Sequence, residues 1–422
     1  MPGGTQGRRA DIALVHYTAP PVVGGVEKVV GRHASLMADA GWAVRIVAGR
    51  GAPTDPRVLF RPVPLADSQH PEIVRTGTEL AAGRVPPWFG GLVGRVLTEL
   101  EAALAGADIV VAHNVASLNQ NMALTAALRI AAGRPAGPRF VLWHHDLAWT
   151  LPRYRPALHE GEPWSLLRTS WPGARQVTIS ESRRADLAAL LGIGPDSIEV
   201  IPGGVDLPDE GGPALVDDPE LAARLAGLRP LLLSPVRVTP RKNLELALRT
   251  VGALRQLGRP AGLVVTGPVD PHDATGRHYL ESLLRLRHEL QLDEMVFICA
   301  ETEAGAASTE TLGDLYREAD ALILPSWDEG FGLPILEAAV SRLPIVCSNL
   351  ASLRELAGEA AVYVDPGGDA SGVAQAVLEA LARNPEAGAA LDRRVRTTYS
   401  WASVYERHIA PLMERTLAEP RG

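Results

Sequence analysis

Lysine is almost absent from this chain of 422 residues. Of its 41 basic residues only Lys28 and Lys242 are lysines, and the others are arginines. The chain carries a net charge of −8, which gives no general reason to expect nucleic-acid binding, because that function needs a basic face. Arginine used almost everywhere indicates a coding bias against lysine. The two positions that keep lysine, both at predicted helix starts after turn-like segments, are therefore candidates for function.

Cysteine and long apolar runs are also scarce. Cys299 and Cys347 lie in apolar, strand-like runs, where buried and inert thiols are expected. No window approaches the roughly 20 apolar residues of a membrane span. Arg8 and Arg9 resemble the start of a twin-arginine signal, but the apolar run 12–17 is too short for one. We expect a cytoplasmic protein, with a peripheral membrane contact left open.

What the chain has instead is a regular alternation of β-rich and helical segments. Such alternation predicts two doubly wound α/β domains of the Rossmann type, each with a parallel sheet. Residues 202–219, dense in Gly, Pro and Asp, form the predicted linker, and residues 400–417 a final amphipathic helix that returns to the first domain. The predicted strands are 11–16, 43–48, 108–113, 139–144, 175–180 and 197–201, then 230–234, 263–267, 295–299, 321–325, 344–348 and 361–365.

The segment PSWDEGFGLPILEAAV (325–340) places two glutamates eight residues apart. We expect a buried strand, a glycine loop holding Glu329, and a helix with Pro334 at its first position and Glu337 in its first turn. Backbone N–H groups at such a helix start favour an anion. Two carboxylates would repel a bare phosphate, so a nucleotide sugar, which carries hydroxyls as well as phosphates, fits better. Taken alone, an acidic residue in a first helical turn such as Glu337 usually stabilises the helix dipole.

Two further strand-to-helix turns carry candidate ligand contacts. Gly24 and Gly25 follow the first strand and allow close backbone approach, although an ordinary turn is the alternative. The pattern is not G-x-G-x-x-G, which counts against a nicotinamide enzyme. Arg237 and Lys242 follow strand 230–234 and supply the positive charge that a departing diphosphate needs. The alternative for this cluster is a solvated basic loop.

Histidines end two of the strands in the first half. His113 closes strand 108–113, and His144 and His145 close strand 139–144. Neither group has metal-ligand spacing, so we expect no metal site there. Ligand contact and a purely structural role both remain open for them. Ser180 is a candidate cap for a helix over 182–191. The tryptophans of this half are expected mostly in the core: Trp88, Trp143, Trp149, Trp164 and Trp171.

Taken together, these motifs resemble those of the retaining GT-B glycosyltransferases of the GT4 type. The E-x7-E signature of that family is present as Glu329-GFGLPIL-Glu337, and the other motifs occupy matching places over nearly the whole chain. The resemblance implies a GT-B fold. Residues 1–203 with helix 400–418 would form an acceptor-side domain, and residues 204–399 a nucleotide-sugar-binding domain.

The resemblance also implies roles for individual residues. Glu337 would bind the ribose and Glu329 the sugar, while backbone amides near Gly330, Phe331, Gly332 and Leu333 meet the phosphates. Arg237 and Lys242 would stabilise the diphosphate, with Gly24 and Gly25 lying against it. His145 would face the anomeric region, with His144 as the alternative. Where many relatives have Asn-Gly-Val-Asp, this chain has Gly203-Gly204-Val205-Asp206, so any role of that Asn side chain is missing.

The expected activity is transfer of a hexose from a nucleoside-diphosphate sugar to an acceptor hydroxyl, with retention and without a metal or tightly bound cofactor. The alternatives are a GT-B nucleotide-sugar epimerase or hydrolase, and an inactive nucleotide-sugar-binding scaffold. The sequence leaves open the base (UDP, GDP or ADP), the sugar, the acceptor and the oligomeric state. A variable loop over 61–95 and the Trp-rich segment 147–171 are expected to shape the acceptor pocket.

Overall fold

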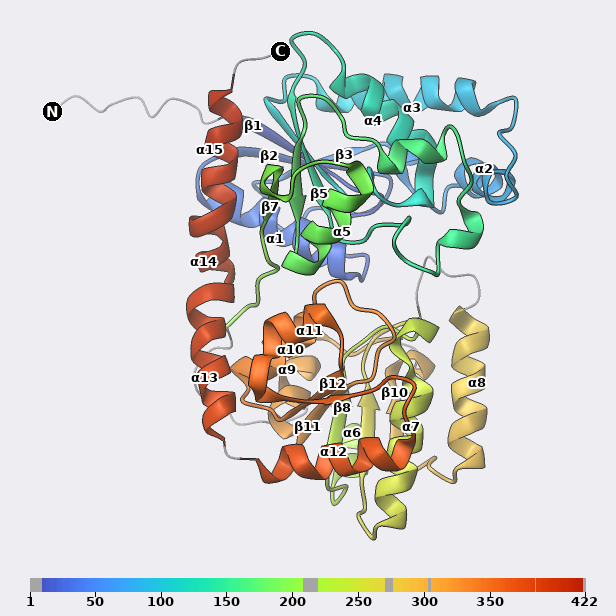
Figure 1. Cartoon of the computed structure of the whole chain (residues 1–422), viewed down its shortest axis with the longest axis vertical. Coiled ribbons are helices and arrows are strands. Elements are labelled where there is room, and N and C mark those ends of the chain that lie inside the picture. The colour runs from blue at the N-terminus through green and yellow to red at the C-terminus, as the bar shows by residue number, and fades with distance from the viewer. Residues whose placement is uncertain (1–9, 208–218, 270–275, 303–304, 384, 420–422) are drawn as a thin grey trace, which may run out of the picture. The chain divides into compact units, whose positions relative to one another are not determined.

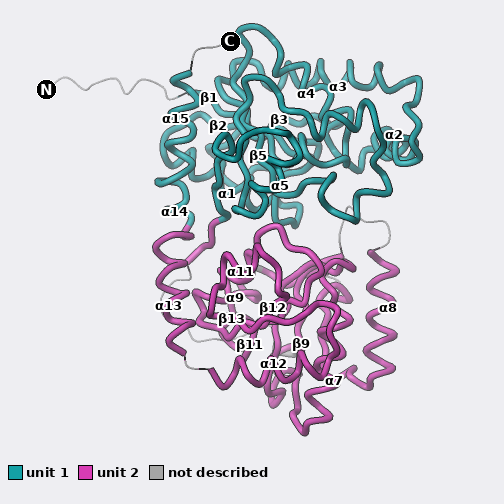
Figure 2. Tube along the Cα trace, in the orientation of Figure 1, with its two compact units in different colours: residues 1–203, 401–422 teal, residues 204–400 magenta. Residues whose placement is uncertain are grey.

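The chain folds into two compact units. One comprises residues 1–203 and 401–422, and the other residues 204–400 (Figure 2). The computed structural model describes residues 10–207, 219–269, 276–302, 305–383 and 385–419. Most of the predicted linker, residues 208–218, lies outside these ranges. No helix within them combines the length and the apolar character that crossing a membrane requires.

The described part of unit 1 holds a seven-stranded parallel sheet, drawn in blue to green in Figure 1. Its strand order is β3-β2-β1-β4-β5-β6-β7. The chain builds outward from β1 to β3 and then restarts on the other side of β1 with β4. The neighbours β1 and β4 therefore form a topological switch point, where ligands of doubly wound folds bind. The strands are β1 (Asp11–Val15), β2 (Ala43–Ala48), β3 (Leu59–Pro62), β4 (Ile109–His113), β5 (Arg139–His144), β6 (Arg175–Thr178) and β7 (Ile198–Val200).

Helices cover both faces of this sheet. Alternate strand residues such as Ala13 and Val15 pack with α3 and α4, whereas on the other face the rings of His33 in α1 and Trp401 in α14 contact one another beside Trp143 of β5. Figure 1 shows α3 and α4 side by side. The helices are α1 (Gly25–Asp39), α2 (Pro71–Ala81), α3 (Phe89–Leu104), α4 (Met122–Ala132), α5 (Glu181–Leu191), α14 (Trp401–Val404) and α15 (Ala410–Ala418).

Unit 2 repeats the same topology with fewer strands. Its described residues hold a six-stranded parallel sheet in the order β10-β9-β8-β11-β12-β13, with the switch point between β8 and β11. This is the strand order of the dinucleotide-binding Rossmann fold. The strands are β8 (Leu231–Ser234), β9 (Gly262–Val265), β10 (Val296–Ile298), β11 (Ala321–Leu324), β12 (Ile345–Ser348) and β13 (Ala361–Val364). The prediction of two doubly wound α/β units is confirmed.

The helices of unit 2 alternate with these strands. The helices α7 and α12 pack against each other, and α13 packs on α10 (Figure 1). The helices are α6 (Pro219–Leu225), α7 (Leu244–Gln256), α8 (Gly276–Glu289), α9 (Thr309–Glu318), α10 (Leu333–Val340), α11 (Ala351–Ala357), α12 (Ala370–Ala382) and α13 (Glu386–Arg394).

The last helical stretch combines α-helix with wider π-helical turns. Residues Tyr405–Ile409 are π-helical, and Pro411 stands in the first turn of α15, where no N–H is required. The indole Nε1 of Trp42 donates a hydrogen bond of 3.0 Å to the hydroxyl of Tyr405. This stretch therefore belongs to unit 1 through buried contacts.

Some local predictions were wrong. The loop expected over 61–95 instead contains the end of β3, the whole of α2 and the start of α3. Strand β3 was missed because three of its four residues are exposed, so it has no apolar run. Cys347 is buried as expected, but Cys299 is only half-buried because β10 ends one residue before it. Most of the unit 1 tryptophans are buried as predicted, and Trp88 is 38% exposed.

Candidate functional site

In unit 2, the loops that follow β8 and β11 start from neighbouring strands at the switch point. Leu232 and Leu233 of β8 pair with Ala321 and Leu322 of β11, so the carboxyl ends of the two strands are adjacent. The first loop carries Arg237 and Lys242, and the second carries Glu329. The parallel topology therefore brings together segments that are almost 90 residues apart in the sequence.

Asn243 fixes the first loop to its neighbours. It ends the 3-10 turn Pro240–Lys242 in a left-handed conformation, with φ of 51°, which Asn tolerates better than most residues. Its Nδ2 donates hydrogen bonds to the carbonyl oxygens of Pro325 (3.0 Å) and Pro366 (2.8 Å). One side chain thus ties together the loops after β8, β11 and β13.

Lys242 and Glu329 form a buried ion pair. The Nζ of Lys242 donates to Oε1 of Glu329, and only 8% and 7% of the two side chains are exposed. The same Oε1 accepts a hydrogen bond of 2.9 Å from Oγ of Ser326. The guanidinium of Arg241 lies 3.7 Å from the other carboxylate oxygen. Two cations thus surround one carboxylate, and Asp328 adds a further negative charge near Lys242.

The environment shifts the pKa values of both partners downward. Burial lowers the pKa of Lys242 to about 8, and the charge of Arg241 adds to this shift, while Glu329 opposes it. Burial alone would raise the pKa of Glu329, but the charges of Lys242 and Arg241 and the hydrogen bonds outweigh it and keep that pKa below its usual value. At neutral pH both groups are therefore charged.

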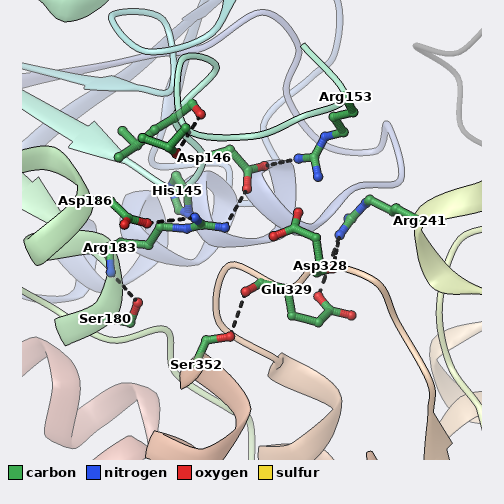
Figure 3. A network of polar contacts seen from close by, with 12 residues as sticks. His145, Asp146, Arg153, Ser180, Arg183, Asp186, Arg241, Asp328, Glu329 and Ser352 are labelled. Atoms are coloured by element: carbon green, nitrogen blue, oxygen red, sulfur yellow. Dashed lines mark hydrogen bonds and ion pairs between the residues drawn. The ribbon is translucent and has the colours of Figure 1, made fainter. Parts of the chain in front are cut away.

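The glycine loop adopts a conformation that requires glycine at Gly332. Its φ is +101°, and a Cβ there would lie 2.6 Å from Cδ2 of Leu353. The hydroxyl of Ser352 donates a hydrogen bond of 2.7 Å to the carbonyl oxygen of Glu329 (Figure 3). Gly330 and Leu333 are half-buried, and Phe331 is buried.

The position of the following helix corrects two expectations. Helix α10 begins at Leu333, so Pro334 is its second residue rather than its first. Glu337 is the fifth residue and lies in the second turn, because the left-handed Gly332 ends the loop immediately before Leu333. Stabilisation of the helix dipole, which is confined to the first turn, therefore explains Glu337 less well than anticipated.

Glu337 is held by a tyrosine of the preceding helix. The hydroxyl of Tyr316, in α9, donates a hydrogen bond of 2.7 Å to Oε2 of Glu337. Tyr316 is buried, and burial together with the charge of Glu337 holds its pKa well above the usual value. The Tyr316 hydroxyl therefore remains a hydrogen-bond donor at every accessible pH.

Arg237 is half-buried in the loop after β8, where the backbone N–H of Val238 donates to the carbonyl oxygen of Pro268.

In unit 1, the turn after β1 also carries a buried acid. Gly24 caps α1 with an extended backbone, and a Cβ at Gly25 would meet nothing within 4 Å. Glu27, in the first turn of α1, is 3% exposed and accepts a hydrogen bond of 2.7 Å from Oγ1 of Thr18. Its carboxylate lies 3.8 Å from Nε2 of His16.

The strand-end histidines of unit 1 have different partners. His144 contacts Oε1 of Gln176 through Nε2 at 2.8 Å, within the sheet. His145 instead contacts Nδ1 of His113 through Nε2 at 3.1 Å. Burial lowers the pKa of His144 to about 4 and holds the pKa of His145 well below its usual value. The histidines are thus neutral near pH 7. Among the described residues no cluster of His, Cys, Asp and Glu has the arrangement of a metal site.

Asp146, directly after His145, lies between two arginines (Figure 3). Its carboxylate is 3.4 Å from Arg153 and 3.9 Å from Arg183. Ser180 caps α5, as predicted, by accepting a hydrogen bond of 3.2 Å from the backbone of Arg183. These contacts order the chain that follows β5.

Several residues of these networks were not among the predicted site residues. Tyr316 holds Glu337 and Ser352 holds Glu329 from distant segments, whereas Ser326 contacts Glu329 from three residues away. In unit 1, His113 contacts His145, and His16 and Glu27 contact each other. His113 was recognised as a strand-end histidine, and its place at the end of β4 was the available signal. Nothing in the local sequence marks the partner of Tyr316.

Comparison with known proteins decides the family. A model of the glycosyl transferases group 1 matches residues 223–397, and a model of glycosyltransferase family 4 matches residues 23–208. The chain belongs to the GT4-type glycosyltransferases. The two matches fall on different halves of this glycosyltransferase and together span most of it.

Mannosyltransferases are among the relatives of this glycosyltransferase. It is 28% identical to the MMP alpha-(1->4)-mannosyltransferase of Mycolicibacterium hassiacum over 96% of this chain and 98% of that protein. It is also 28% identical to the GDP-mannose-dependent alpha-(1-6)-phosphatidylinositol monomannoside mannosyltransferase of Mycobacterium tuberculosis, covering 69% and 74% of the two chains. Identity with the O-antigen chain mannosyltransferase B of Escherichia coli reaches 43%, but over 77 residues, which are 18% of this chain and 20% of that protein.

Solved structures support the GT-B fold. Sucrose-phosphate synthase from Thermosynechococcus elongatus superposes with a TM-score of 0.70 at 19% identity, over 97% of this chain and 100% of that one. At this identity the likeness concerns the fold alone. The predicted GT-B fold and glycosyltransferase family are thus confirmed.

Proposed function

We propose that this glycosyltransferase moves a hexose from a nucleoside-diphosphate sugar to an acceptor hydroxyl with retention at the anomeric carbon. The observation that carries the proposal is the buried pair of Lys242 and Glu329 with Arg241 beside it, at the strand ends of the unit 2 switch point. Cations fixed at this position stabilise the negative charge that develops on a departing diphosphate. The carboxylate of Glu329, in the same cluster, can accept hydrogen bonds from sugar hydroxyls.

Each predicted residue has a place in this reaction. Lys242 and Arg237 neutralise the diphosphate, and the backbone of Gly330, Phe331, Gly332 and Leu333 binds its oxygens. Glu337 accepts from the ribose hydroxyls, and Glu329 accepts from the sugar. Gly24, Gly25 and His145 are proposed as further contacts of the donor. The acceptor hydroxyl attacks on the face that the diphosphate leaves and passes its proton to a phosphate oxygen, so no separate base is required.

GDP-mannose is the donor that the relatives favour, because the names of several state mannosyl transfer and one states GDP-mannose dependence. A thermal-shift screen of GDP-mannose, UDP-glucose and ADP-glucose tests the preference, since a ligand that binds only the folded state raises its stability. We expect the largest shift with GDP-mannose, and loss of that shift in Glu337→Ala. A full shift in Glu337→Ala would contradict the proposed ribose contact.

Incubation with the preferred donor and water separates transfer from hydrolysis or epimerisation. The proposal predicts slow release of mannose that is not epimerised. NMR of the anomeric proton monitors the release. Rapid release of an epimerised sugar would contradict it.

A further inference from the structure

The imidazole of His113 is fixed on several sides. It is fully buried at the end of β4, and its ring stacks on Trp143 at 5.4 Å between centroids. The ring Nδ1 of His113 contacts Nε2 of His145 at 3.1 Å, and the backbone carbonyl oxygen of His113 contacts Nδ1 of His16 at 2.8 Å. The ring has little freedom to rotate away from His145, because a rotation would break the stacking and the ring contact together.

The other nitrogen of this ring identifies its tautomer. Nε2 of His113 is buried and has no hydrogen-bond partner among the residues that the structure describes. Burial, with the nearby His33, His145 and His16, holds the pKa of His113 well below its usual value, so the ring is neutral and carries one proton. A proton on Nε2 would leave a buried N–H group without an acceptor, and such groups are rare in folded proteins. The proton therefore belongs on Nδ1, where it is donated to His145.

The tautomer of His145 follows from that of His113. If Nε2 of His145 accepts this hydrogen bond, the neutral ring of His145 must carry its own proton on Nδ1. We propose that His113 is a positioning residue that fixes His145 as an Nδ1–H tautomer, so that His145 acts on the sugar or diphosphate as a hydrogen-bond donor and not as a base. This inference rests on the proposed function and makes it more specific.

The assignment has a chemical consequence for the transfer reaction. The only lone pair of the neutral His145 ring is occupied by the hydrogen bond from His113. His145 therefore has no free site for the proton of the acceptor hydroxyl, and that proton goes to an oxygen of the departing diphosphate. The Nδ1–H group instead donates to an electronegative oxygen of the donor substrate.

NMR of the full-length protein labelled with 15N-histidine tests the tautomer directly, because protonated and unprotonated ring nitrogens have well-separated shifts. We expect His145 with a proton on Nδ1 and none on Nε2, the signals being assigned by their absence in His145→Ala. A proton on Nε2 of His145 would overturn the proposal. This readout needs no substrate, so it stands or fails separately from the proposed glycosyl transfer.

Matched variants test the role in turnover. Asn places its amide near the position of Nδ1, and Gln places its amide near that of Nε2. We expect His113→Gln and His113→Phe to lower kcat on the order of tenfold, the factor that one hydrogen bond supplies, and His113→Asn to recover a substantial part of it. His278→Asn, at an exposed position in α8, is the control and should leave kcat unchanged.

The comparison of Asn with Gln remains informative even if the larger change to Phe prevents folding. Equal kcat in the Asn and Gln variants, with melting temperatures like that of the wild type, would contradict the positioning role. So would a folded Phe variant that keeps both the wild-type kcat and the wild-type tautomer of His145.

Discussion

The ammonium of Lys242 and the carboxylate of Glu329 form an ion pair from which water is almost excluded. Removing one member of such a pair leaves the other buried without a counter-charge, at a cost of about 3–5 kcal/mol. We therefore expect Glu329→Leu to lower the free energy of unfolding by about that amount. The double variant Lys242→Met/Glu329→Leu should lose less, because neither charge is left behind. Urea unfolding followed by circular dichroism measures both.

The control for this comparison is an exposed pair in unit 1. Arg95 and Glu72 also form an ion pair, but their side chains are 54% and 46% exposed. Glu72→Leu should leave the unfolding midpoint almost unchanged, since solvent screens such pairs. If the double variant at Lys242 and Glu329 is less stable than Glu329→Leu, the unpaired charge of Lys242 does not explain the loss of stability in Glu329→Leu.

The pKa of Lys242 near 8 predicts how activity depends on pH. In the proposed reaction the protonated amine stabilises the departing diphosphate, so kcat/KM for the donor should fall as pH rises through about 8 and Lys242 loses its proton. The groups facing it are Arg241, Asp328 and Glu329. In Lys242→Arg the alkaline decline should disappear, because arginine stays charged, while the rate at neutral pH drops with the altered geometry. An identical decline in that variant would assign it to another group.

The hydroxyl of Tyr316 orients Glu337, and its removal should weaken donor binding. We expect Tyr316→Phe to raise KM for the nucleotide sugar about five- to tenfold with kcat little changed, because one hydrogen bond to a carboxylate is lost in ground and transition state alike. Steady-state kinetics with varied donor measure this. Tyr363→Phe, which removes a hydroxyl bonded to the carbonyl of Gly358, is the matched control. A fall in kcat alone would argue against a binding role.

Substitution by alanine should lower stability at Gly332 of unit 2 and activity, without loss of stability, at Gly25 of unit 1. Gly332→Ala forces a Cβ into Leu353 at a left-handed φ, and we expect a loss of stability of about 1–3 kcal/mol. Gly25→Ala meets no atom within 4 Å, so its melting temperature should be unchanged. Its kcat/KM should nevertheless fall if the donor approaches this backbone closely. A Gly25→Ala enzyme with full activity would exclude such an approach.

The sequence was sufficient for the strands that are buried and not for those that are exposed. Strands such as β8 and β11 are continuous apolar runs and were found within a residue or two. Strand β3 has a mostly exposed sequence, LFRP, so neither an apolar run nor an alternation marks it. The start of α10 depended on the left-handed Gly332, a backbone angle that a sequence pattern does not encode.

The sequence predicted the candidate site residues that lie within one loop, but not the contacts between loops. The spacing of Glu329 and Glu337 and the position of Lys242 can be read along one loop each. The contacts of Lys242 with Glu329 and of His113 with His145 depend on which strands are neighbours. Predicted strand positions do not say that β8 is the neighbour of β11, or β4 of β5. The contact of Tyr316 with Glu337 likewise follows only from the three-dimensional structure.

The carboxamide of Asn243 joins loops that leave three different strands of the unit 2 sheet. In the proposed function, a nucleotide sugar that binds there meets a preassembled frame and does not have to immobilise each loop separately, so less of its interaction energy is lost to ordering. Attempts to change donor preference should therefore alter side chains that the frame presents and leave Asn243 itself in place.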